Sequence, residues 1–484
     1  MEGSAAWGAL GPELPPLVDH HCHGVLREAP GPAGFEALLS ESDRPAARGT
    51  TYFDTQAGFA VRRWCPPLLG LPAHCPPEDY LARRRELGEP ETRRRLLRAT
   101  GIGTYLVDTG LPGVLTGPRE TADAGGGSGL EIVRLERLAE RLAAEVMRGA
   151  GGASPAEAGP GASGEGAGGT RSGRGASREA RRVPSGEVVP GAPGPVAGEG
   201  TGGAWPVRGA PREAVSRQGA SEEAVSRPGT PRDAVSRHGA SGKAVSRPGA
   251  SGEAAEVWTA RIAEAVREAA GSAAGFKSVA AYRHGLALAP DPPDRGEVTA
   301  AAARWLASGG RRLTDPVLLR HLLWLAVATG RPLQLHTGFG DPDLRLHQAD
   351  PALVTDFLRA TADTGTDVIL LHGYPYHRHA AYLASVFPHA YADVGLAVSH
   401  TGPRAEEVLA EFLELAPFGK LLFSTDAHGL PERYVIGAAL FRTALGGVLS
   451  GWVRSGAWSA ADAGRVGALI AAGNARRVYG LGED

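Results

Sequence analysis

Three histidines stand within four residues near the start of the chain, in Leu17-Val-Asp-His-His-Cys-His-Gly24. The apolar beginning predicts a buried strand, and because side chains alternate along a strand, His21 and His23 should leave it on one face. Asp19 should share that face and His20 should oppose it. Neutral imidazole is a common zinc ligand, and a pair separated by one residue suits a strand better than a helix. The alternative is a solvated histidine-rich loop, so the interpretation depends on further ligands elsewhere.

Those further candidates stand at the ends of later apolar runs, where His336, His372 and Asp426 occur. Eight short runs have the character of strands, namely residues 17–24, 103–109, 130–136, 276–282, 332–337, 367–373, 390–395 and 420–426. Helical pattern separates them, which predicts an α/β fold, a closed parallel (β/α)8 barrel of the TIM type with its chemistry at the carboxyl ends of the strands. An open doubly wound sheet is the alternative, but no glycine-rich phosphate loop follows any of these runs.

The candidate ligands have a chemical logic of their own. His21, His23 and His336 offer three neutral nitrogens and Asp426 a carboxylate oxygen, which leaves a coordination position for water on a divalent ion. Such an ion lowers the pKa of water toward 7, and Asp426 could take the proton and pass it to a leaving group. His372 would polarise or hydrogen-bond the substrate oxygen. The alternative for any single histidine is a hydrogen-bonded structural role, which we expect for His347, His377, His379 and His389.

Lysine is rare in this chain, since only Lys243, Lys277 and Lys420 occur among 51 basic residues. Where only a positive charge is needed, arginine serves, so a remaining lysine is a candidate for a role that arginine cannot fill. Lys277 falls in the predicted fourth strand, on the face of Val279 and Ala281. It could point into the barrel, and its structural alternative is an ion pair with a carboxylate such as that of Glu136.

Composition narrows the class of partner and the compartment. A formal net charge of -2 gives no electrostatic reason to expect nucleic acid or an anionic membrane, so a small-molecule substrate fits better. The three cysteines are too few for a disulfide framework, and Met1 to Leu14 lacks a basic, apolar signal sequence. The apolar stretch Val317 to Thr329 is broken by charge and too short to span a bilayer. We expect a soluble cytoplasmic protein, for which a homo-oligomer is compatible with the sequence.

A long segment from 149 to 253 differs from the rest of the chain. Glycine, alanine, serine, proline, arginine and glutamate dominate it, and Ala-Val-Ser-Arg recurs every ten residues from Ala214 to Ala244. Each repeat offers one valine, too little to offset an ordering cost of about 1–2 kcal/mol per residue, so a solenoid is disfavoured. We predict a disordered insertion that divides the barrel into residues 1–148 and 254–484, with a binding tail as the alternative.

The constellation resembles a known family. Asp19-x-His21-x-His23 with His336, His372 and Asp426 resembles the amidohydrolase superfamily of metal-dependent barrels. The runs His336-Thr-Gly-Phe-Gly-Asp, Leu371-His-Gly-Tyr-Pro-Tyr and Ser424-Thr-Asp-Ala-His-Gly-Leu-Pro are similar to the amidohydrolase-related domain found alone in bacteria or fused to glutamine synthetase in fungi and plants. Some members carry a carbamylated lysine between two metals on the fourth strand, which implies that Lys277 could be a second-metal bridge. A mononuclear branch does without it.

The resemblance implies hydrolysis of a carbon–nitrogen bond, in an amide or a γ-glutamyl amide, with zinc as the expected ion. Non-oxidative decarboxylation of an unsaturated or aromatic acid is the alternative within enzymes, since a related branch uses the same ligand set. A non-catalytic signalling or scaffold domain is a third possibility. Loop residues beside the ligands are candidates for substrate binding, with ordinary loop polarity as the alternative: Tyr374, Tyr376, His428, Asp341 and Arg378. Asp108 and Asp393, at the ends of two predicted strands, are similar candidates.

Overall fold

The computed structural model describes residues 13–111, 113–151 and 248–482. Most of the predicted insertion at 149–253 lies outside these residues, so its disorder stays a prediction. The described helices extend into its predicted limits, because α6 (Leu135–Gly151) includes its first three residues and α7 (Pro248–Ala270) includes its last six. All described residues belong to one compact unit.

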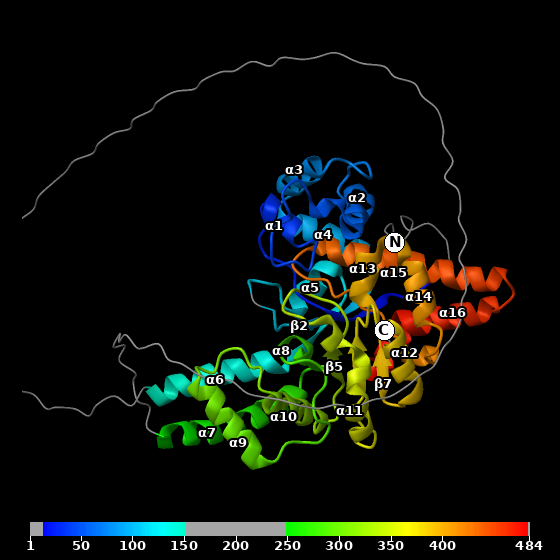
Figure 1. The fold of residues 1–484 in the computed structure, drawn as a ribbon. Helices are drawn as coiled ribbons and strands as arrows, with labels where there is room; N and C mark the ends of the chain where they lie inside the picture. The colour runs from blue at the N-terminus through cyan, green and yellow to red at the C-terminus, as the bar shows by residue number, and fades with distance from the viewer. Residues whose placement is uncertain (1–12, 112, 152–247, 483–484) are drawn as a thin grey trace, which may run out of the picture. The chain divides into compact units, whose positions relative to one another are not determined.

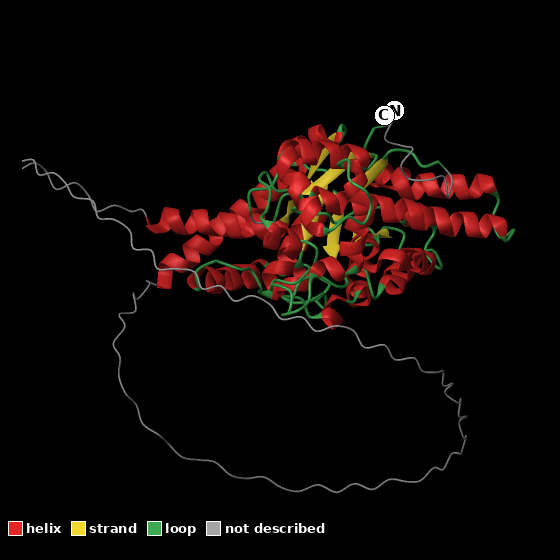
Figure 2. Ribbon diagram, turned by 90° about the horizontal axis from the view of Figure 1, so that it is seen from above, coloured by secondary structure: helices red, strands yellow, loops and turns green. Residues whose placement is uncertain are grey.

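Seven parallel strands form one sheet in which each strand pairs with the next along the chain. Figure 2 shows these strands at the centre of the described part, surrounded by helices. Strands joined by crossover helices in this order are those of a TIM-like barrel, as the sequence predicted. The strands are β1 (Leu17–Cys22), β2 (Ile102–Asp108), β3 (Ser128–Arg134), β4 (Gly275–Ser278), β5 (Leu333–His336), β6 (Val368–Leu371) and β7 (Ala390–Ala392).

The predicted eighth strand, residues 420–426, is an extended segment without regular strand pairing. It still closes the barrel, because its backbone bonds to strands on both sides. Leu422 N donates to Ala392 O of β7 at 3.0 Å, and His20 N of β1 donates to Phe423 O at 3.2 Å. Asp426 N donates to His21 O at 3.0 Å. The prediction of a regular eighth strand is therefore wrong in detail, while the closed barrel that it served is confirmed.

A register shift in β1 changes which histidines share a face. Asp19 pairs with Tyr105 and Cys22 with Val107. Between these two pairs the chain advances by three residues in β1 but by only two in β2. Such a bulge interrupts the alternation of side chains. His20 bonds to Tyr479 and Asp393, whereas Asp19 accepts hydrogen bonds from Thr425. The strict alternation predicted for this strand is wrong: His20 turns inward with His21, and Asp19 turns outward.

The core has two apolar clusters. The smaller one fills the barrel interior with side chains from the strands, the closing segment and the last helices, including Val18, Leu106, Ile132, Ile369, Leu371, Leu422, Val478 and Tyr479. The larger one lies between the sheet and the surrounding helices. Helix α17 (Asn474–Tyr479) brings Tyr479 to the inner cluster, where its hydroxyl accepts from Gln334 Nε2 at 2.8 Å. The interior below the histidines is therefore packed, and Gln334 Nε2 and the Tyr479 hydroxyl are hydrogen-bonded there.

Two strand ends differ from prediction because helices begin earlier than expected. β3 ends at Arg134 and α6 begins at Leu135, and β4 ends at Ser278 shortly before α8 (Ala280–Arg283). The other described α-helices are α1 (Pro32–Ala37), α2 (Gln56–Leu68), α3 (Pro77–Leu87), α4 (Glu89–Ala99), α5 (Pro118–Gly125), α9 (Arg295–Ala307), α10 (Pro316–Val327), α11 (Thr355–Ala360), α12 (His377–Val386), α13 (Gly395–Thr401), α14 (Ala405–Phe412), α15 (Pro431–Arg454) and α16 (Ala460–Ala468).

Helix α15 has 24 residues and is longer than the apolar stretch Val317 to Thr329, which the sequence analysis considered too short to span a bilayer. By length and composition it could cross a membrane, with a mean hydropathy of 1.3 over its most apolar window. Within the fold, however, 67% of that window is buried. It packs against α2, α4, α13 and α14. This packing is typical of a core helix, so the length of α15 is weak grounds for a membrane span.

Candidate functional site

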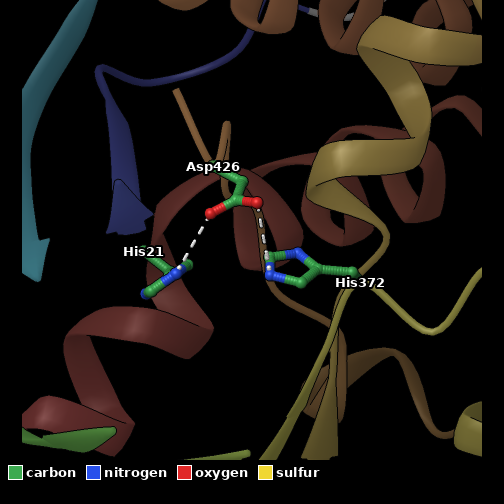
Figure 3. A group of neighbouring side chains, drawn as sticks. All are labelled: His21, His372 and Asp426. Carbon is green, nitrogen blue, oxygen red and sulfur yellow. Dashed lines mark ion pairs between the residues drawn. The ribbon is translucent and has the colours of Figure 1, made fainter. Parts of the chain in front are cut away.

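The five residues predicted to meet at the barrel rim do meet there. His21 lies on β1 and His23 directly follows it, His336 ends β5, His372 follows β6, and Asp426 ends the closing segment. All five side chains are buried. Because the strands are parallel, their carboxyl ends share one edge, which brings residues from distant parts of the sequence together. Figure 3 shows His21 and His372 pointing at opposite oxygens of Asp426.

Asp426 is the centre of this cluster. Its Oδ1 lies 3.1 Å from His21 Nε2 and 3.3 Å from His23 Nε2. Its Oδ2 lies 3.5 Å from His372 Nε2. The carboxylate thus divides its oxygens between the β1 pair and the histidine that follows β6.

The backbone at this site is held in an uncommon conformation. His372 has φ 71° and Asp426 has φ 50°, in the left-handed region that residues other than glycine seldom adopt. Such residues cost free energy and persist only where surrounding contacts fix them. At both positions the left-handed turn follows a strand end, and it aims the side chain into the cluster instead of along the strand.

Asp393, a candidate from the sequence, fixes His372 and does not enter the cluster. Its Oδ1 accepts hydrogen bonds from His372 N at 2.8 Å and Gly395 N at 2.9 Å. Its Oδ2 bonds to His20 Nε2 at 2.7 Å and accepts from Ser424 Oγ at 3.1 Å. These bonds keep Asp393 ionised, because together with the nearby His20 they overcome burial and lower its pKa. Asp393 is thus a positioning residue that ties β1, β6, β7 and the closing segment together.

His336 lies against a tyrosine that the sequence analysis missed. The Tyr282 ring is centred 4.5 Å from the His336 ring, which itself is 5.0 Å from the His372 ring. The predicted strand 276–282 includes Tyr282, and no pattern in the sequence connects this residue with His336. The early start of α8 brings it there. Gly340 leaves room for both groups, since a Cβ at that position would clash with the Tyr282 hydroxyl and lie 3.3 Å from His336 Nε2.

Lys277 points into the site, and its amine contacts the histidine cluster. Its Nζ lies 3.0 Å from His21 Nε2. Burial lowers the pKa of this lysine to about 8, although Asp108 and Asp426 favour its charged form. The alternative ion pair with Glu136 is not formed, because Glu136 Oε1 accepts from Ser278 Oγ and Val279 N. The placement is compatible with the predicted second-metal bridge, which stays a prediction.

Burial also sets the charge of the site. It lowers the pKa values of His21, His336 and His372, and nearby Lys277 lowers them further. The imidazoles are therefore neutral at pH 7 and able to bind a metal. For Asp426, burial opposes ionisation, but His372, His21 and His23 outweigh it and hold the pKa well below its usual range.

The residues present fit a divalent ion. Two groups have ligand atoms that all lie within 4.8 Å of one another, one of His21, His372 and Asp426 and one of His21, His23 and Asp108. Several buried ring nitrogens have no hydrogen-bond partner among the described residues, namely His21 Nδ1, His336 Nε2 and both nitrogens of His372. Buried polar atoms without partners are costly, and neutral nitrogens around one carboxylate are a common donor set for zinc. The second group adds Asp108, which the sequence offered only as a candidate for substrate binding at the end of a predicted strand.

A cavity of about 1510 Å³ opens onto the cluster. His23, Lys277, His336, Asp426 and His428 all line it. His428, predicted to contact the substrate, therefore lies where a bound molecule could reach it. Burial lowers the pKa of this histidine to about 4, so it faces the cavity uncharged.

The two predicted tyrosines have other surroundings. Tyr374 stacks on His377 and Tyr376 stacks on His379, and neither lines the cavity. They follow the left-handed turn at His372, which leads the loop away from the cluster. The Arg378 guanidinium donates two hydrogen bonds to Glu414. The structure thus gives these three residues no contact with the candidate site.

The histidines expected to be structural lie outside the site. His377 bonds to Glu411 at 2.8 Å, His379 to Asp350 at 2.9 Å and His389 to Thr361 at 3.1 Å. His347 lies exposed in a short helical turn. Their partners are carboxylates or a hydroxyl on neighbouring elements, as in ordinary histidine hydrogen bonds.

Comparisons with known proteins agree with this geometry. A family model described as amidohydrolase matches residues 210–481, more than half of the chain. Protein fluG of Emericella nidulans is 34% identical over 242 residues, which cover 47% of this chain and only 28% of fluG.

Solved structures show the same fold at lower identity. A protein described as a metal-dependent hydrolase from Lactobacillus casei aligns over 97% of this chain and 96% of its own with a TM-score of 0.65 and 23% identity. A glucuronate isomerase from Caulobacter crescentus aligns over 98% and 93% with a TM-score of 0.52 and 13% identity. These likenesses support the barrel alone, and the family follows from the sequence match. The chain belongs to the amidohydrolase family.

Proposed function

We propose that this chain is a metal-dependent hydrolase that cleaves a carbon–nitrogen bond in an amide or γ-glutamyl amide. The observation that carries the proposal is the convergence of three imidazoles, those of His21, His23 and His372, on one ionised, buried carboxylate at the barrel rim, with the His336 ring beside His372. Because the chain covers only 28% of fluG, the proposal does not depend on the activity of fluG.

We propose that His21, His23, His336 and Asp426 hold the ion, which we expect to be zinc. When bound there, a divalent ion supplies a Lewis acid that lowers the pKa of water. His372 Nε2 lies at the rim without a hydrogen-bond partner, so it can orient the substrate oxygen. Asp426 Oδ2 lies on the His372 side and can accept a proton there and return it to the leaving nitrogen.

The cavity supports a substrate larger than a single amide group. It has room for the groups on both sides of a scissile bond and is lined by both acidic and basic side chains. His428 lies close to His23, with ring centroids 6.4 Å apart, so it can contact substrate next to the cluster. The contacts described for Asp393 and Tyr282 limit the motion of His372 and His336 during turnover.

The first experiment measures bound metal by mass spectrometry in the full-length protein and in His21→Ala with His23→Ala. We expect about one divalent ion per chain in the wild type and its loss in the double variant. His377→Ala with His379→Ala is the matched control, since both histidines lie outside the site. Metal retained at full occupancy in the first double variant would remove the basis of the proposal.

The second experiment incubates the metal-loaded protein with a panel of amides, γ-glutamyl amides and unsaturated or aromatic acids. Release of ammonia or an amine supports hydrolysis of a carbon–nitrogen bond. Release of carbon dioxide without an amine would replace this proposal with decarboxylation. If the metal-loaded protein converts no compound of a broad panel, the result would favour a non-catalytic domain.

A further inference from the structure

Arg134 stands beside the metal-ligand cluster, and no role in the chemistry above uses it. It is the last residue of β3 and the register partner of Lys277 on β4. Its side chain is 11% exposed, and that exposed part lines the cavity. A guanidinium here lies at the same barrel rim as the histidines, where ligands of such barrels bind.

Two of its three nitrogens are fixed by one carboxylate oxygen. Nε donates to Asp108 Oδ2 at 2.9 Å and Nη2 donates to the same oxygen at 2.6 Å. Asp108 is itself fixed, because its Oδ1 accepts from Gly110 N at 2.8 Å. The remaining nitrogen, Nη1, has no hydrogen bond to the described residues and is the part free to meet a ligand in the cavity. A guanidinium held in this way loses little side-chain freedom when it binds an anion.

Gly110 leaves the space that the side chain of Arg134 fills. A Cβ on this glycine would lie 2.4 Å from Cβ of Arg134 and 2.6 Å from both its Cδ and its Nε. Any side chain at position 110 would therefore displace the whole arginine side chain, from Cβ to Nε, while leaving its charge intact. The glycine does not have a positive φ, so close approach is the reason that its lack of a side chain matters here.

The charges around the cluster favour an anion once a divalent ion is bound. Arg134 and Lys277 offset the carboxylates of Asp108 and Asp426 at this end of the cavity. A divalent ion would then leave this end of the cavity with a net positive charge. In a buried site, a carboxylate that meets a guanidinium gains a charge-assisted hydrogen bond, which is stronger than one between neutral groups.

We propose that Nη1 of Arg134 binds a carboxylate of the substrate, so that the enzyme selects amides bearing a free carboxylate over neutral amides. Arg134 is then a specificity-determining residue and Gly110 a positioning residue for it. This inference rests on the proposed function for the reaction, but the binding subsite can be tested without turnover.

The test measures binding by calorimetry to the zinc-loaded, full-length protein. The probes are glutarate, which carries two carboxylates, and glutaramide, its neutral counterpart. We expect glutarate to bind the wild type at least about tenfold more tightly than glutaramide. Arg134→Gln should weaken glutarate binding by about 10- to 100-fold, within the range of a charged hydrogen bond, and leave glutaramide binding unchanged. Arg267→Gln is the matched control, because this exposed arginine lies on α7 and pairs with Glu264 on the same helix.

Two further measurements separate ligand binding from a purely structural role. Zinc content and thermal midpoint of Arg134→Gln should stay close to those of the wild type. Gly110→Ala keeps the charge but displaces the side chain, so it should also weaken glutarate selectively, and it decides the question if Arg134→Gln fails to fold. Equal binding of both probes in the wild type, or unchanged glutarate affinity in both variants, would overturn the proposal. If no amide is hydrolysed but these binding results hold, the subsite stands and the proposed reaction fails.

Discussion

At the scale of single residues, Asp426 combines an uncommon backbone conformation with contacts to three histidines. Its left-handed backbone turns the carboxylate into the cluster, where Oδ1 faces two histidines and Oδ2 a third. One oxygen can therefore bind a metal while the other handles a proton. If Asp426 has both roles, removing its charge should lower the metal content and the turnover rate by different amounts.

Asp426→Asn tests this division. Asparagine keeps an oxygen in place but cannot accept the proton, so we expect partial loss of metal and a fall in turnover of about 10²- to 10⁴-fold. Bound metal and turnover are measured on the same preparation, with the substrate found by the amide panel. His372→Asn is the companion variant, expected to keep the metal and lose rate. Wild-type turnover by metal-loaded Asp426→Asn would rule out the proton-transfer role.

The residue types and their spacing were sufficient to predict which five side chains meet at the rim. Each stands at the end of an apolar run, and parallel strands bring such ends together. The inward turn of His20 could not be predicted, because the bulge in β1 depends on pairing with β2. Arg134 and Tyr282 were also missed as site residues, since each depends on where a strand gives way to a helix.

At the scale of elements, three helices behind the barrel share a buried ionic network. Arg84 on α3 lies 3.0 Å from Glu89 at the start of α4 and 2.7 Å from Glu432 at the start of α15. Tyr80 donates to the same Glu432 oxygen at 2.7 Å. One guanidinium thus serves two buried carboxylates. Burial, with repulsion from Glu432, outweighs Arg84 and raises the pKa of Glu89 to about 7.

This shift predicts a pH dependence of stability. Between about pH 4.5 and 7, the folded chain keeps a proton on Glu89 that the unfolded chain releases, so the free energy of unfolding should fall as the pH rises through this window. Glu89→Gln mimics the protonated carboxyl, so the variant should lose this part of the dependence and be more stable than the wild type at pH 7.5. Thermal midpoints at pH 5 and pH 7.5 measure the effect.

A matched control for this experiment is Glu264→Gln, which removes an exposed carboxylate from the surface of α7. It should shift neither midpoint by more than a degree or so. If Glu89→Gln retains the full wild-type difference between the two pH values, the network does not hold a proton on Glu89, and the pH dependence arises elsewhere.

At the scale of the whole molecule, the barrel is assembled from parts that are far apart in the chain. β1 and the closing segment around Asp426 are neighbours in space at opposite ends of the sequence. The order of strands could be predicted because helical pattern separates the apolar runs. The irregular closing segment could not, because its pairing depends on bonds from β1 and β7 and not on any local pattern.

The helix pair α6 and α7 lies where the chain enters and leaves residues 152–247. The two helices pack on each other, and both helix ends that border this segment lie at the same end of the pair (Figure 1). The buried Trp258 Nε1 of α7 donates to Ala139 O of α6 at 3.1 Å, and Arg261 pairs with Glu145 at 2.8 Å. These contacts do not involve the intervening residues.

We therefore expect that replacing residues 152–247 by a short glycine-serine linker leaves the barrel and its site intact. The shortened chain should unfold in one cooperative transition within a few degrees of the full-length midpoint and bind the same amount of metal. Trp258→Ala is the comparison that should destabilise both chains, by about 3–5 kcal/mol, because it removes a large buried side chain from the helix pair. Should the shortened chain lose cooperative unfolding while the full-length chain keeps it, residues 152–247 contribute to the fold itself, and the prediction of an insertion that the barrel does not need is wrong.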